Sequence, residues 1–86
     1  MSNSIFKSIE TYTVDTTAGK TITGPGIACI VYKEINTNLD YYPLINIDGL
    51  NSFSPEIGGN YLFKNSLKLY TNKSGYEIKA VVAVFN

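Results

Sequence analysis

The feature that most constrains the fold is the regular alternation of short β-forming runs with clusters of turn residues. Thr, Tyr, Ile, Val and Phe fill the runs, while Gly, Pro, Asn and Asp interrupt them along all 86 residues. No stretch has the apolar spacing of a long amphipathic helix. The pattern therefore predicts an all-β protein of about seven to eight short strands.

The spacing of these runs indicates how the strands are arranged. Strands are predicted over residues 9–14, 21–23, 27–35, 41–47, 61–63, 67–71 and 76–85. Eight strands in a chain of this length give about eleven residues per strand and turn, which is typical of two packed antiparallel sheets. Residues 1–8 show neither turn signals nor periodicity. We therefore expect an N-terminal arm over residues 1–8 and a single β-sandwich domain over residues 9–86.

Three turn signals locate the connections between strands. Asp48-Gly49 is the strongest, because a tight hairpin turn needs two central residues that accept positive φ. Gly24-Pro25-Gly26 ends the strand before it, since Pro cannot donate to a ladder. Residues 54–60 are expected to form a loop, with Ile57 turned inward.

Missing residue types exclude several function classes. The chain has no His and one cysteine, Cys29, so it cannot build a His-dependent nucleophile or the usual His and Cys zinc site. Its net charge is zero and every basic residue is Lys, which argues against a nucleic-acid partner. We expect a protein that is not an enzyme, with no catalytic residues, no cofactor and no metal.

Other patterns give little support to an enzyme or a membrane protein. Gly19-Lys20-Thr21 lacks the upstream Gly and following helix of a phosphate-binding loop, and the carboxylates show no paired arrangement. A small enzyme with a carboxylate pair remains the weakest alternative. No apolar run reaches the length of a membrane span, so we expect no membrane span.

Two strands are apolar on both faces. In the last strand Glu77 and Lys79 begin an outward row that continues as Val81, Ala83 and Phe85, opposite an inward row of Val82 and Val84. Residues 27–32 show the same property. Either the arm folds back over one of these stripes through Ile5, Phe6 and Ile9, or other subunits cover them. Exposed apolar patches usually mark an interface, which favours an oligomer or a component of an assembly.

The order of several short segments also resembles a family. These segments are AGKTIT at 18–23, GNYLF at 59–63, SLKLY at 66–70 and GYEIK at 75–79, followed by a Val-rich end. They resemble the small jelly-roll virion proteins of tailless icosahedral bacteriophages: penton or vertex, spike-base and minor capsid proteins. The resemblance implies a jelly-roll-like sandwich with a structural role in the capsid. It implies a ring-like homo-oligomer that contacts a major capsid protein and is soluble in the host cytoplasm before assembly.

These considerations select candidate residues and one alternative function. The candidates for subunit contacts are Phe6, Ile30, Tyr41, Tyr42, Val81, Ala83 and Phe85. The alternative is a small carbohydrate-binding or adhesion module, because tyrosine rings suit both interfaces and sugar faces. Tyr41, Tyr42 or Tyr61 would then form the platform, with loop Asn and Asp side chains binding sugar hydroxyls.

Overall fold

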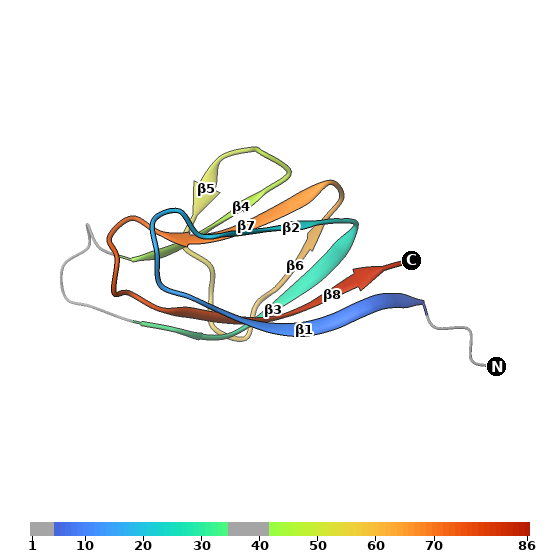
Figure 1. Ribbon diagram of the computed structural model, residues 1–86, viewed down its shortest axis with the longest axis horizontal. Helices are drawn as coiled ribbons and strands as arrows, with labels where there is room; N and C mark the ends of the chain where they lie inside the picture. Colours follow the sequence, from blue (N-terminus) through green and yellow to red (C-terminus); the bar gives the residue numbers. More distant parts are fainter. Residues whose placement is uncertain (1–4, 35–41) are drawn as a thin grey trace.

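The computed structural model describes residues 5–34 and 42–86, and within them all regular structure is β (Figure 1). The strands are β1 (Phe6–Val14), β2 (Lys20–Thr23), β3 (Gly26–Lys33), β4 (Pro43–Ile47), β5 (Ser52–Phe53), β6 (Asn60–Phe63), β7 (Ser66–Thr71) and β8 (Ile78–Phe85). The predicted all-β class and the predicted strand number are confirmed.

The strands form two antiparallel sheets of four that pack face to face (Figure 1). The first sheet has the order β1-β8-β3-β6 and the second the order β2-β7-β4-β5. β1 pairs with β8, β2 with β7, β3 with β6 and β4 with β5. One long hairpin has thus been rolled up, with β8 against β3 and β7 against β4 closing the roll. This eight-stranded, two-sheet arrangement is a jelly roll, as predicted.

Local chemistry explains two of the bends in the chain. Asp48 and Gly49 have φ values of 57° and 74°, and the N–H of Leu50 donates to the carbonyl of Ile47 over 3.0 Å. This is the predicted tight turn between β4 and β5. At the start of β3, a Cβ on Gly26 would lie 2.6 Å from the carbonyl oxygen of Ala83. The residue must therefore be glycine for β3 to approach β8.

The core lies between the two sheets and receives alternate side chains from seven of the strands. It consists of Val14, Ile22, Ala28, Ile30, Ile45, Phe63, Leu67, Leu69, Ile78, Ala80 and Val82. Thr71 is also fully buried, and its hydroxyl lies 3.1 Å from the carbonyl oxygen of Lys73 and 3.3 Å from that of Tyr42. Among the described residues, this satisfied hydroxyl is the only buried polar side chain of the core.

The structure corrects three local predictions. β1 begins at Phe6, so Phe6, Lys7 and Ser8 belong to a sheet and not to a free arm. Ile57 is 48% exposed, whereas Pro55 in the same loop is fully buried. The short strand β5 was not predicted, because two residues are too few for an alternating pattern. Pairing with β4 creates it.

Candidate interaction surface

The outer face of the first sheet carries an apolar row that crosses all four strands. Ile9 pairs with Ala83, Ala83 with Ile27, and Ile27 with Leu62. Directly paired residues point to the same face of a sheet. Ala28, Val82 and Phe63, which are next to them in the chain, are buried, so this row points away from the core. Ile9 and Leu62, at its two ends, are 59% and 67% exposed.

Further apolar side chains extend this row along the strands. Val81 pairs with Cys29 on one side of it, and on the other side the ring of Phe6 stacks on that of Phe85 with 5.5 Å between the centroids. We call this surface the apolar face. It comprises Phe6, Ile9, Ile27, Cys29, Leu62, Val81, Ala83 and Phe85.

The opposite outer face is polar at the equivalent positions. In the second sheet Thr21 pairs with Lys68, Lys68 with Asn46, and Asn46 with Ser52. Asn46 donates to the hydroxyl of Ser52 over 3.1 Å, and the ammonium of Lys68 lies 4.7 Å from the ring centroid of Tyr70. An antiparallel sheet with one face in water normally has polar residues there. The second sheet follows this rule and the first breaks it.

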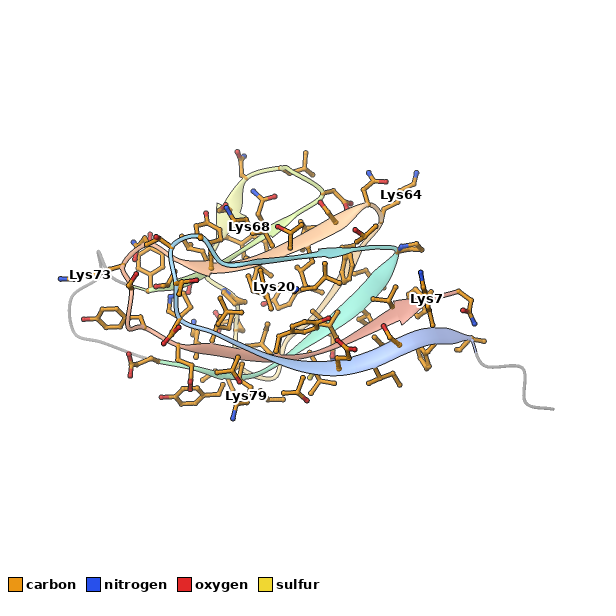
Figure 2. The ribbon with its side chains drawn as sticks, in the orientation of Figure 1. Lys7, Lys20, Lys64, Lys68, Lys73 and Lys79 are labelled. Atoms are coloured by element: carbon orange, nitrogen blue, oxygen red, sulfur yellow. The ribbon has the colours of Figure 1, made fainter. Side chains whose placement is uncertain are left out.

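Charged residues are sparse on the outer face of the first sheet. Lys79 projects from the first sheet away from the second, and in the register of the described strands it is the only charged residue at an outward position of that sheet (Figure 2). Lys64 and Lys73 lie at the two ends of the sandwich (Figure 2). The centre of the apolar face is therefore uncharged, as is typical of the core of a protein interface.

The structure brings four of the predicted contact residues together. Phe6, Val81, Ala83 and Phe85 all belong to the apolar face. Ile30 does not, because it is fully buried between the sheets and shares its face with Ala28. As a core residue it is not available for subunit contacts, and this prediction was wrong.

The two candidate tyrosines do not join the apolar face. Tyr41 lies outside the described residues. Tyr42 precedes β4 in the second sheet, where its N–H donates to Oδ1 of Asn72 over 2.9 Å. This half-buried residue connects β4 to the turn after β7. It is therefore remote in the sheet order from the strands that carry the apolar face.

Four residues of the apolar face were not among the candidates selected from the sequence. Ile9 was missed because it stands between the polar residues Ser8 and Glu10. Leu62 was missed because the aromatic residues on either side of it leave no alternating pattern. Only pairing places them at the ends of the same row. Ile27 and Cys29 lie in the segment recognised as apolar on both faces, and strict alternation from Ala28 would have selected them instead of Ile30.

The described part of the arm does not cover the stripe. Ile5 and Ile9 are 68% and 59% exposed and lie along β1, at the side of β8. Phe6 contacts Phe85 by stacking beside it within the same face. Phe6 and Ile9 therefore widen the apolar face and leave Val81 and Ala83 at its centre.

Tyrosine side chains lie apart and are engaged within the chain. The hydroxyl of Tyr61 accepts the N–H of Glu56 over 2.8 Å, and its ring packs on Phe53. The hydroxyl of Tyr70 donates to Ser52 over 2.6 Å. Tyr61 belongs to the first sheet and Tyr70 to the second. These residues do not form one platform.

The described residues show no arrangement suited to metal chemistry, since none of their His, Cys, Asp and Glu side chains gather in threes. Residues 5–34 and 42–86 contain no helix long and apolar enough to cross a membrane. Comparison of the chain with protein-family models, curated proteins and solved structures found no match. Functional inference therefore rests on the jelly roll and on its apolar face.

Proposed function

We propose that this protein is a non-enzymatic structural subunit of a virion, in a penton, vertex or minor capsid position, that assembles through its apolar face. The observation that carries the proposal is the row from Ile9 through Ala83 and Ile27 to Leu62, which the described chain leaves uncovered. The jelly-roll strand order, common among capsid domains, supports it. So does the resemblance to small phage virion proteins.

The size of the apolar face is consistent with this role. Four strands about 4.8 Å apart and three outward rows about 6.8 Å apart give twelve positions over roughly 400 Å² in projection. The apolar face fills eight of these positions, or roughly 260 Å². A contiguous apolar patch of a few hundred Å² on a small soluble chain usually marks a contact site. We propose that the neighbours are further copies in a ring-like homo-oligomer and a major capsid protein.

A charge-insertion experiment tests assembly through this face. Replacing Val81 and Ala83 together with Lys places two charges at its centre, and we expect assembly through this face to be lost, with a lower molar mass and no unfolding. Light scattering measures the molar mass and circular dichroism the fold. The control replaces the exposed Thr23 of the polar outer face with Lys, and we expect no change in molar mass.

Two results would overturn the proposal. If the unmodified protein stays a monodisperse monomer at micromolar concentration and binds no capsid component, the apolar face is not an assembly surface. If the Val81 and Ala83 variant unfolds while the control stays folded, these residues belong to the core. Mass spectrometry of purified virions tests the location, and a glycan-binding screen tests the carbohydrate-binding alternative.

A further inference from the structure

The edge of the first sheet presents a second surface, distinct from the apolar face. β1 is the terminal strand in the order β1-β8-β3-β6 and has nine residues, Phe6–Val14. Long edge strands carry unpaired backbone groups that another chain can pair with. The chain contains no Pro between Phe6 and Val14 that would block such pairing.

Hydrogen bonds at the end of β8 show which backbone groups of β1 face the open edge. The N–H of Phe85 donates to the carbonyl oxygen of Pro25, which precedes β3. The N–H of Asn86 donates to the carbonyl oxygen of Ile5, which precedes β1. In an antiparallel ladder successive residues direct their N–H and C=O groups to opposite sides. Even-numbered residues of β8 therefore face β1.

The register of β1 against β8 extends this rule to β1. Ser8 pairs with Val84 and Val14 with Ile78, so even-numbered residues of β1 use their backbone groups in the ladder with β8. Ile9, Thr11 and Thr13 consequently direct their N–H and C=O groups away from β8, toward the open edge. Their side chains are exposed on the outer side of the sheet.

We propose that the β1 edge pairs with β1 of a second copy of this chain, antiparallel about a two-fold axis at Thr11. Thr11 is the centre of the regular segment Ser8–Val14, so this register pairs the greatest number of residues. It also places Thr11 opposite its own copy as a hydrogen-bonded pair, with Ile9 opposite Thr13 of the second copy.

Charges on β1 select the same register. Glu10 points to the inner side of the sheet, where its carboxylate accepts a hydrogen bond from the hydroxyl of Tyr12 over 2.8 Å. An axis at Glu10 would place two carboxylates face to face, which is unfavourable. An axis at Thr11 instead places Glu10 opposite Tyr12 of the second copy. The tyrosine hydroxyl is a suitable donor to this carboxylate, since Tyr12 of the same copy already donates to it.

Opposite charges at the two ends of β1 add to this complementarity. Lys7 lies near its start and Asp15 follows its end, and both side chains are exposed. Antiparallel pairing brings each Lys7 toward Asp15 of the other copy, twice by symmetry. The first sheets of the two copies then form one continuous eight-stranded sheet, and the apolar faces of both copies lie on the same side of it. The joint apolar face is then roughly 520 Å² in projection, twice that of one copy.

Cysteine cross-linking tests the register directly. In a Cys29→Ala background, Thr11→Cys places two thiols in a hydrogen-bonded pair with Cα atoms about 5.5 Å apart, within disulfide range. We expect a mild oxidant to produce a covalent dimer. Thr13→Cys on the same face of the same strand is the matched control. Its copy would lie about 13 Å farther along the strand, so we expect no homodimer.

A mixture of chains sharpens this test. Ile9→Cys and Thr13→Cys chains should cross-link to each other after mixing, because these residues are opposite in the proposed register. The proposal would be overturned if the Thr11→Cys and Thr13→Cys chains cross-linked equally. It would also be overturned if neither chain cross-linked at about 100 μM, a concentration at which a dimer with a Kd of about 1 μM is almost fully formed.

A backbone variant gives an independent readout in solution. Thr11→Pro removes an N–H that faces the open edge and leaves the ladder with β8 intact. We expect at least about a tenfold weaker dimer by light scattering, equal to 1.4 kcal/mol, with an unchanged circular dichroism spectrum. An unchanged dimer would contradict the edge pairing. If the Thr11→Pro variant does not fold, the cross-linking of the cysteine variants tests the edge pairing alone.

The test separates this inference from assembly through the apolar face. Val81 and Ala83 do not lie on β1, so the variant with Lys at both positions should still form the edge dimer of 2 × 9.5 kDa, about 19 kDa. A dimer that Thr11→Pro leaves intact and the Lys variant dissociates would place the contact on the apolar face alone.

Discussion

The carboxylate of Asp48, in the turn between β4 and β5, accepts a hydrogen bond from the backbone N–H of Asn65, in the turn between β6 and β7, over 2.6 Å. The same oxygen lies 3.0 Å from the N–H of Lys64 and 3.1 Å from that of Ser66. One side chain thus satisfies three successive backbone donors of another hairpin. The hydrogen bond from Asn65, followed by that from Ser66, lowers the pKa of Asp48 below its ordinary value.

This contact predicts a pH-dependent stability. Because the folded-state pKa of Asp48 is lowered, its stabilisation is fully present above the unfolded pKa of about 4 and is lost as the pH falls through the folded pKa. Asp48→Asn keeps a residue that tolerates positive φ but removes the charge. We expect a lower melting temperature than the unmodified protein at pH 7.

Thermal unfolding from pH 7 to pH 2 checks this expectation. The difference in melting temperature between the two proteins should shrink below about pH 4 as Asp48 becomes protonated in the folded state. A difference that stays constant down to pH 2 would show that the charge of Asp48 does not contribute. Glu56→Gln, in the exposed loop before β6, is the control and should show little difference at any pH.

Neighbouring residues of β3 should respond differently to truncation. Ile30 is fully buried, so Ile30→Ala leaves a cavity in the core and should reduce the free energy of unfolding by about 2–5 kcal/mol. Val31 is 45% exposed, and Val31→Ala should change the free energy of unfolding by about 0.5 kcal/mol or less. Urea unfolding measures both. Similar losses for the two variants would contradict the assignment of Ile30 to the core.

The close approach of β3 to β8 predicts that Gly26 accepts no side chain. A Cβ there would lie 2.5 Å from Cζ of Phe63 and 2.6 Å from the carbonyl oxygen of Ala83. The ring can turn, but the backbone carbonyl is fixed in a ladder. Gly26→Ala should therefore lower the free energy of unfolding by about 1–3 kcal/mol. A urea midpoint equal to that of the unmodified protein would show that β3 and β8 can move apart at Gly26 without loss of stability.

Cys29 is a natural reporter for the apolar face. It lies there beside Val81 and is partly exposed. We expect its modification by a maleimide to slow as the protein concentration rises, because assembly covers this face. In the variant with Lys at 81 and 83, the rate should not depend on concentration. A rate that is also independent of concentration in the unmodified protein would argue against burial of this face.

Local sequence chemistry determined much of the fold. The turn at Asp48-Gly49 was predicted because these two residues accept positive φ, and the structure shows values of 57° and 74°. The inward and outward rows of β8 followed from the period of two in a strand, which placed Val81 and Ala83 outside and Val82 inside. These properties depend on a few consecutive residues, so the sequence by itself is sufficient for them.

Tertiary pairing decided the rest. Ile9 and Leu62 are 53 positions apart, and only the order β1-β8-β3-β6 makes them the two ends of one apolar row. The same pairing buried Ile30, formed β5 beside β4, and directed the backbone groups of Thr11 to an open edge. The physical reason is that strand order and register depend on contacts between distant segments. No local pattern contains that information.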